Sequence, residues 1–141
     1  MRWVTRIVIH VPELCGVFMT YDRSPEVVKR YWRPLGGGST PFDTDWRSTG
    51  VRETREEGGF IITPEQVTYI NESTSPGGHQ IYLGYAEISA EEAKWVQPET
   101  AESEDVVAFL TYEEARLPQY RGIPIHSGYQ ASMFNGPLAH V

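Results

Sequence analysis

The sequence predicts an α/β (α+β) domain in which helices cover a mixed β-sheet. Three observations lead to this prediction. Apolar, strand-like runs lie on both sides of one long polar helical segment, short helical segments follow late in the chain, and 141 residues suit a single globular domain. No internal repeat or low-complexity linker divides the chain, so residues 1–141 are expected to fold as one domain.

The N-terminal part contains three candidate strands. Apolar side chains recur at alternate positions over residues 3–11, which is typical of a half-buried strand. Residues 15–21 form a second apolar, β-prone run, and the turn-forming residues 22–25 follow it. A third, aromatic run over residues 30–35 stops at the three glycines 36–38. We therefore expect three strands before the first helix.

The longest helix is expected over residues 45–57. This segment contains no proline and a single glycine, and most of its residues tolerate a helix. Gly58 and Gly59 follow at the place where a helix ends in a left-handed cap.

The second half is expected to contain three strands and three short helical segments. Two helix starts are marked by capping boxes, in which Ser or Thr is followed three residues later by Glu. The strand candidates are residues 67–71, 80–88 and 106–110; the helical candidates are residues 90–96 after Ser89 and Glu92, a segment opened by Thr111 and Glu114, and one turn near residues 130–134.

Charge and composition argue against several classes of protein. The 12 Lys and Arg against 19 Asp and Glu give a net charge of -7, which disfavours a large nucleic-acid-binding surface. Arg6 and His10 interrupt the N-terminal apolar residues too early for a signal peptide or a membrane span, so we expect a soluble, cytoplasmic protein. The single Cys15 is expected to be buried, and the four histidines, which lack zinc-site spacing, to lie at the surface or in loops.

Three glutamates in the predicted long helix indicate a metal site. Glu53, Glu56 and Glu57 are spaced i, i+3 and i+4, so they share one helix face. Each pair of like charges there costs roughly 0.2 to 0.5 kcal/mol in an isolated helix. A divalent cation reverses the sign of this interaction, and Mg²⁺ prefers oxygen ligands completed by substrate phosphates. Together with the preceding glycines, the cluster predicts a diphosphate-cleaving site that binds Mg²⁺, with Mn²⁺ as an alternative.

Residues 36–60 resemble the signature of the Nudix (MutT-like) hydrolase family. That signature is G, five residues, E, seven residues, then R-E-U-x-E-E-x-G-U, where U is apolar. Gly38 supplies the first position, and residues 52–60 (RETREEGGF) supply the last nine in register. Thr44 stands where the first Glu is expected, and Thr54 stands where the family prefers an aliphatic residue.

Weaker similarity extends over roughly residues 3–117. It includes Trp32 and Pro34 before the glycines, and the acidic residues 102–105 that precede the strand and helix after them. The resemblance implies a Nudix-type α/β/α sandwich with a mixed central β-sheet.

The resemblance also implies an activity and a set of site residues. The expected reaction is Mg²⁺-dependent hydrolysis of the pyrophosphate bond of a nucleoside diphosphate linked to another group, by water attack at phosphorus. The implied metal ligands are Glu53, Glu56 and Glu57. For the general base, Glu53 is the first candidate and Glu104 the second. Glu57 is also an implied catalytic residue, and Arg52 is implied to orient a glutamate. The expected substrate contacts are Trp32, Arg33, Gly37 and Gly38.

Two other functions fit the same residues. The chain could be a Nudix-fold module that binds or senses a nucleotide without cleaving it, for which Thr44 is the support, or a hydrolase of a non-nucleotide diphosphate. The expected partner is a small nucleotide or another diphosphate, with no membrane, and the protein is expected to be a monomer or a homodimer.

Overall fold

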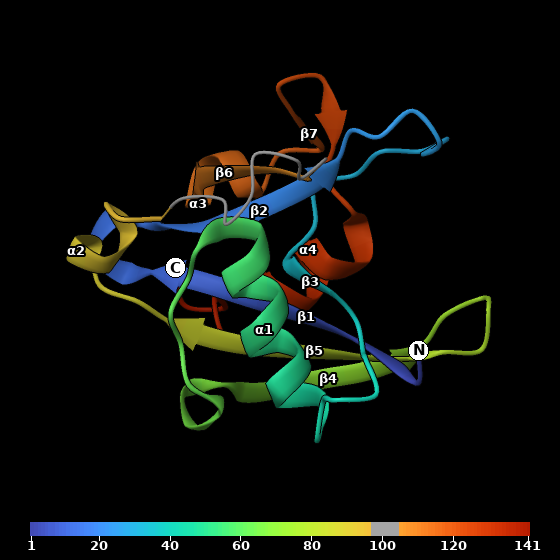
Figure 1. Cartoon of the computed structure of the whole chain (residues 1–141). Helices are drawn as coiled ribbons and strands as arrows, with labels where there is room; N and C mark the ends of the chain where they lie inside the picture. Colours follow the sequence, from blue (N-terminus) through green and yellow to red (C-terminus); the bar gives the residue numbers. More distant parts are fainter. Residues whose placement is uncertain (97–104) are drawn as a thin grey trace.

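A mixed β-sheet with helices on both faces forms the centre of the molecule (Figure 1). The computed structural model describes residues 1–96 and 105–141. The strands are β1 (Trp3–Val11), β2 (Gly16–Asp22), β3 (Leu35–Gly38), β4 (Thr68–Thr74), β5 (Gln80–Glu87) and β6 (Asp105–Thr111). Their order is β4-β5-β1-β2-β6, and β3 also pairs with β1. The β1–β5 pair is parallel and the other pairs of this sheet are antiparallel.

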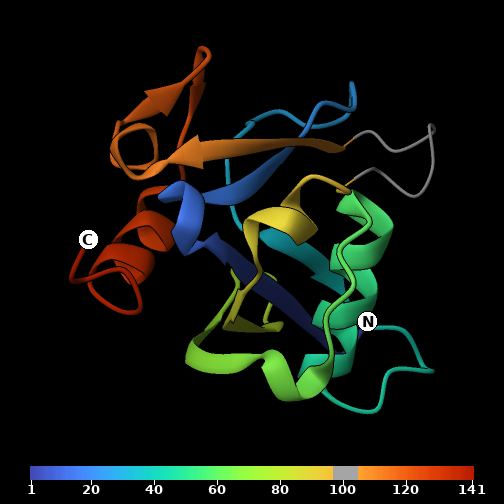
Figure 2. The same cartoon turned by 90° about the vertical axis from the view of Figure 1, so that its left-hand side faces the viewer.

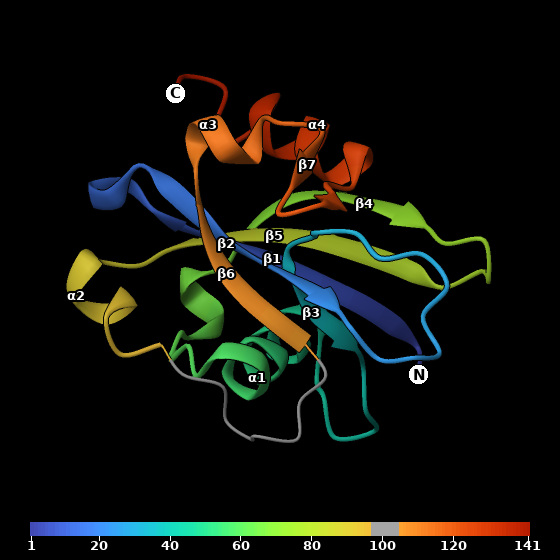
Figure 3. The same ribbon diagram turned by 90° about the horizontal axis from the view of Figure 1, so that it is seen from above.

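The helices lie in two layers. Helix α1 covers one face of the sheet, and α3 and α4 cover the other, as the view from above shows (Figure 3). Figure 2 shows the same layers from the side. The remaining elements are α1 (Trp46–Gly58), α2 (Ala90–Ala93), α3 (Tyr112–Ala115), α4 (Ser127–Phe134), the 3₁₀ helices η1 (Pro12–Leu14) and η2 (Pro64–Gln66), and the two-stranded β7 (Gln119–Tyr120) and β8 (Ile123–Pro124). No helix in the described ranges is long and apolar enough to cross a membrane.

The central strand β1 explains why the molecule has two hydrophobic cores. Successive side chains of a strand point to opposite faces. Ile7 and Ile9 therefore join the core beneath α1, and Val8 joins the core beneath α4. The strand predicted for residues 3–11 is confirmed, but it is buried on both faces and not half-buried as expected.

The predicted helix over residues 45–57 is confirmed to within one residue. Asp45 caps the N-terminus by accepting a hydrogen bond from Ser48 N, and Ser48 accepts one in return from Asp45 N. Gly59 ends the helix with φ 73°, the left-handed conformation that glycine adopts readily. The buried Thr54 donates its hydroxyl to Val51 O, so a polar group is satisfied where an aliphatic residue was expected.

The third strand lies later in the chain than the sequence predicted. Residues 30–33 contribute only isolated bridges, and the glycines themselves form β3 beside β1. A Cβ on Gly36 would lie 1.8 Å from Thr5 O, and its φ is 150°. This close approach of two backbones requires glycine, so a run expected to end the strand is part of it.

Two other expectations from the sequence are wrong. Cys15 is exposed, because it ends η1 with φ 55° where the chain turns between β1 and β2. His10 is buried, because it lies on the central strand. Its ring nitrogens are hydrogen-bonded to the hydroxyls of Tyr85 and Tyr112, at 2.6 and 2.7 Å.

Candidate functional site

The glycine strand β3 lies directly against the glutamates of α1. Gly36 N donates a hydrogen bond of 2.7 Å to Glu57 Oε1. A Cβ on Gly37 would lie 2.6 Å from the carboxyl carbon of Glu53. The glycines thus let two carboxylates rest on the β3 backbone, and this contact fixes where the glutamate face of α1 meets the sheet.

Glu57 is the most deeply buried of the three glutamates. The pKa of its carboxyl is raised to about 8, chiefly by burial and also by the carboxylates of Asp105 and Glu53, against the opposing effects of Arg6 and the Gly36 amide. Such a shift means that the surrounding protein does not stabilise the ionised carboxylate enough to offset the cost of burying its charge. A cation bound nearby would supply it.

Glu53 and Glu56 lie nearer to solvent. The Glu53 side chain is 18% exposed, and burial raises the pKa of its carboxyl while Arg52 opposes the shift. The Glu56 side chain is 47% exposed. Solvent exposure therefore increases from the buried Glu57 through Glu53 to Glu56.

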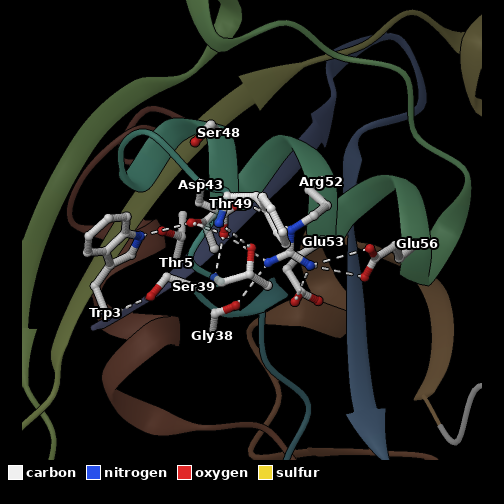
Figure 4. Close-up of polar contacts among 12 residues, drawn as sticks. Trp3, Thr5, Gly38, Ser39, Asp43, Ser48, Thr49, Arg52, Glu53 and Glu56 are labelled. Carbon is white, nitrogen blue, oxygen red and sulfur yellow. Dashed lines mark hydrogen bonds and ion pairs between the residues drawn. The ribbon is translucent and has the colours of Figure 1, made fainter. Parts of the chain in front are cut away.

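Arg52 connects the parts of this site (Figure 4). Its Nη1 donates to Glu53 Oε1 at 3.0 Å and to Glu56 Oε2 at 3.2 Å. Its Nη2 donates to Gly38 O at 3.0 Å, and its Nε and Nη2 bind the two oxygens of Asp43 at 3.1 and 3.0 Å. One guanidinium therefore holds two glutamates, the end of β3 and the loop before α1.

Asp43 is a site residue whose pairing with Arg52 is not predicted by the sequence. Its side chain is 6% exposed and also accepts hydrogen bonds from Thr40 N and Thr49 Oγ1. The Arg52 hydrogen bond is the main reason that its pKa is lowered to about 2. Nothing in the local sequence separates Asp43 from other loop aspartates, because its partner lies nine residues later on α1.

The donor set suits a hard divalent cation such as Mg²⁺. Carboxylate oxygens are its preferred protein ligands, and Glu53 and Glu57 both carry a desolvation penalty that a cation would offset. Within residues 1–96 and 105–141, no three acidic, His or Cys side chains are already gathered as a metal site. Arg52 holds Glu53 and Glu56 in this arrangement, and Glu57 accepts the Gly36 amide.

The expected substrate contacts divide into three groups. Gly37 lies beside Glu53, and Gly38 O accepts from Arg52. Arg33 lines a cavity near α4. Trp32 does not fit: its side chain is 1% exposed, packs edge-on against Tyr21, and donates its indole N–H to Tyr120 O. The expectation that Trp32 contacts substrate is wrong, because the residue belongs to the core. Glu104 lies outside the described residues.

Replacing Gly37 by alanine is expected to lower activity about tenfold or more with little loss of fold. The added methyl must displace the Glu53 carboxylate, and an ångström-scale misplacement of a catalytic group can cost up to about 100-fold. Steady-state turnover and thermal unfolding of Gly37→Ala check this. Gly77→Ala is the control, because its Cβ would meet nothing closer than 3.7 Å. Equal activities for both variants would show that the contact with Glu53 has no role.

Comparison with known proteins identifies the fold. No family sequence model and no curated protein sequence matches the chain. Three similar solved structures are an Ap4A hydrolase from C. elegans (19% identity, 79% of this chain and 82% of that chain, TM-score 0.58), a MutT/nudix family protein from Enterococcus faecalis (15%, 95% and 61%, TM-score 0.61) and a nudix hydrolase family member from Chromobacterium violaceum (20%, 93% and 72%, TM-score 0.56). The chain therefore has the Nudix fold, which confirms the predicted α/β/α sandwich with a mixed sheet.

Proposed function

We propose that this protein is a Mg²⁺-dependent hydrolase of the pyrophosphate bond in a nucleoside diphosphate linked to another group. The observation that carries the proposal is the contact between α1 and β3, where Glu53 and Glu57 are desolvated against a glycine backbone beside the more exposed Glu56. The Nudix fold supports it, and the C. elegans structure with this fold is that of an Ap4A hydrolase.

Glu53, Glu56 and Glu57 would hold the metal. When bound, Mg²⁺ neutralises the phosphate oxygens and orients the nucleophile. Glu53 is the proposed base: its Oε1 accepts from Arg52, and its Oε2 would accept the proton of the attacking water. The water oxygen forms a bond to phosphorus as the bridging P–O bond breaks, and a phosphate group leaves with the bonding electrons. Arg52 keeps Glu53 oriented and favours its ionised form.

A substrate panel tests this function. The purified protein is incubated with nucleoside triphosphates, dinucleoside polyphosphates and nucleotide sugars, in Mg²⁺ or in EDTA, and nucleotide products are separated by chromatography. We expect a nucleoside monophosphate from at least one class, in Mg²⁺ or Mn²⁺ only. Absence of turnover across the panel with metal, or equal turnover in EDTA, would contradict the proposal.

The second candidate is a Nudix-fold module that binds a nucleotide without cleaving it. Two observations favour it: Thr44 replaces the first Glu of the signature, and Arg52 occupies two of the glutamates. Calorimetry that detects nucleotide binding without turnover over hours would support this function. Thr44 is exposed at the start of the capping region, so Thr44→Glu should fold. A gain of activity in that variant would show that the missing Glu limits catalysis.

A further inference from the structure

A basic cavity of about 200 Å³ lies beside the candidate catalytic site. Three cationic side chains, Lys29, Arg30 and Arg33, line it against one carboxylate, Asp22. The Asp22 carboxylate is already engaged, since it accepts a hydrogen bond of 2.8 Å from Ser24 N. The cavity therefore has an excess of positive charge in a protein whose net charge is -7.

Arg33 is the cation most in need of a partner. Its Nε is buried and has no hydrogen-bond partner among the described residues. Its near neighbour Arg6 is also buried, and among the described residues its guanidinium donates to the backbone oxygens of Pro34 at 3.3 Å and Gly36 at 3.1 Å. Burial, and then the charge of Arg33, lower the pKa of Arg6. Two guanidinium groups that disfavour each other in this way would be stabilised by an anion.

Electrostatic interactions connect the residues of the cavity to the glutamates of α1. Arg6 interacts with Glu57 as well as with Arg33. Asp105 pairs with Asp22 in the sheet, where β2 ends and β6 begins. Interactions with Glu57, Arg33 and Arg6 affect the pKa of the Asp105 carboxyl. Hydrogen bonds support this link, because Arg6 donates to Gly36 O and Gly36 N donates to Glu57. A ligand that occupies the cavity would therefore lie next to the proposed cleavage site.

Three aromatic rings and Val27 form the rest of the cavity wall. Tyr31 packs edge-on against His126 with ring centroids 5.6 Å apart, and His126 packs against Tyr129 at 4.6 Å. His126 also accepts a hydrogen bond from Tyr129 N at the start of α4, which fixes its ring. The wall is thus ordered before any ligand arrives, so little conformational entropy would be lost on binding.

We propose that this cavity binds an anionic phosphate group of the substrate away from the bond that is cleaved. What this site means for substrate choice rests on the proposed hydrolase function. The preferred substrates are then polyphosphates, such as nucleoside triphosphates or dinucleoside polyphosphates, over nucleotides joined to a neutral sugar. A neutral group would bring no negative charge to the buried Arg33 Nε, whereas a phosphate oxygen accepts from the guanidinium and from Lys29 together.

Calorimetric titration with inorganic tripolyphosphate in EDTA tests the cavity without relying on catalysis. We expect wild-type protein to bind it, and Lys29→Gln and Arg33→Gln each to bind about tenfold more weakly, which corresponds to about 1.4 kcal/mol of binding free energy. Arg121→Gln, which removes an exposed arginine on the turn between β7 and β8, is the charge-matched control and should bind as wild type. Lys29 is exposed, so its variant decides the result even if Arg33→Gln fails to fold.

The second readout is substrate choice. In Lys29→Gln, the ratio of kcat/KM for the best polyphosphate to that for a nucleotide sugar should fall about tenfold, with no change in Arg121→Gln. Absence of tripolyphosphate binding, or equal binding by all four proteins, would overturn the assignment. If no substrate is turned over but the binding pattern holds, the hydrolase function fails while the anion site stands.

Discussion

Replacing Glu57 by glutamine is expected to lower kcat/KM for metal-dependent hydrolysis by about 100- to 1,000-fold. The substitution keeps the shape of the side chain, and its amide oxygen can still accept the Gly36 N–H. It removes the negative charge that a metal needs at the most buried position of the cluster. Release of nucleoside monophosphate in saturating Mg²⁺ measures the effect, and circular dichroism checks that the fold is retained.

Glu65→Gln is the matched control for this experiment. Glu65 is an exposed acid in η2, outside the site, so its variant should retain wild-type activity. Glu53→Gln should be as damaging as Glu57→Gln, because Glu53 is the proposed base. Full activity in either site variant would show that the glutamates of α1 do not carry the chemistry.

Asp43→Asn is expected to lower the free energy of unfolding by about 2 kcal/mol at neutral pH. The change breaks the two-bond pairing with Arg52 and leaves the guanidinium without its main partner. The effect is smaller than for a fully buried pair because the Arg52 side chain is 22% exposed. Urea unfolding measures it. Asp45→Asn is the control two residues away, because asparagine caps a helix as well as aspartate does.

The same residue predicts how stability depends on pH. The pKa of Asp43 is lowered to about 2 in the folded protein, whereas an unfolded aspartate titrates near about 4. Its contribution, roughly 2 kcal/mol, is therefore fully present above about pH 4 and is lost as the pH falls through about 2. Wild type and Asp43→Asn should thus converge in stability as the pH falls from about 5 to 2. A constant difference between them over that range would contradict the assigned pairing.

Local patterns in the sequence predicted the elements whose signals lie within a few residues. The alternation in β1, the limits of α1 and the capping boxes at Ser89 and Thr111 are of this kind, and the structure confirms them. The spacing of the glutamates likewise predicted that they share one face of α1, since helix geometry alone decides it.

Features that depend on distant partners could not be predicted in this way. The glycines form a strand only because β1 lies beside them, and His10 is buried only because Tyr85 and Tyr112 come to it from other elements. Trp32 looked like a ligand contact because it precedes the glycines, yet its position is set by packing against Tyr21. These contacts join residues far apart in the sequence, so no local period records them.

The proposed function depends most directly on whether the α1 glutamates bind a divalent metal. Electron paramagnetic resonance of Mn²⁺ measures this without any substrate, because the sharp signal of free Mn²⁺ is lost when the ion binds. We expect wild-type protein to bind Mn²⁺, Mg²⁺ to compete for the same site, and the double variant Glu53→Gln/Glu57→Gln to leave the signal unchanged. Undiminished Mn²⁺ binding by the double variant, or no binding by the wild type, would contradict the proposed metal site.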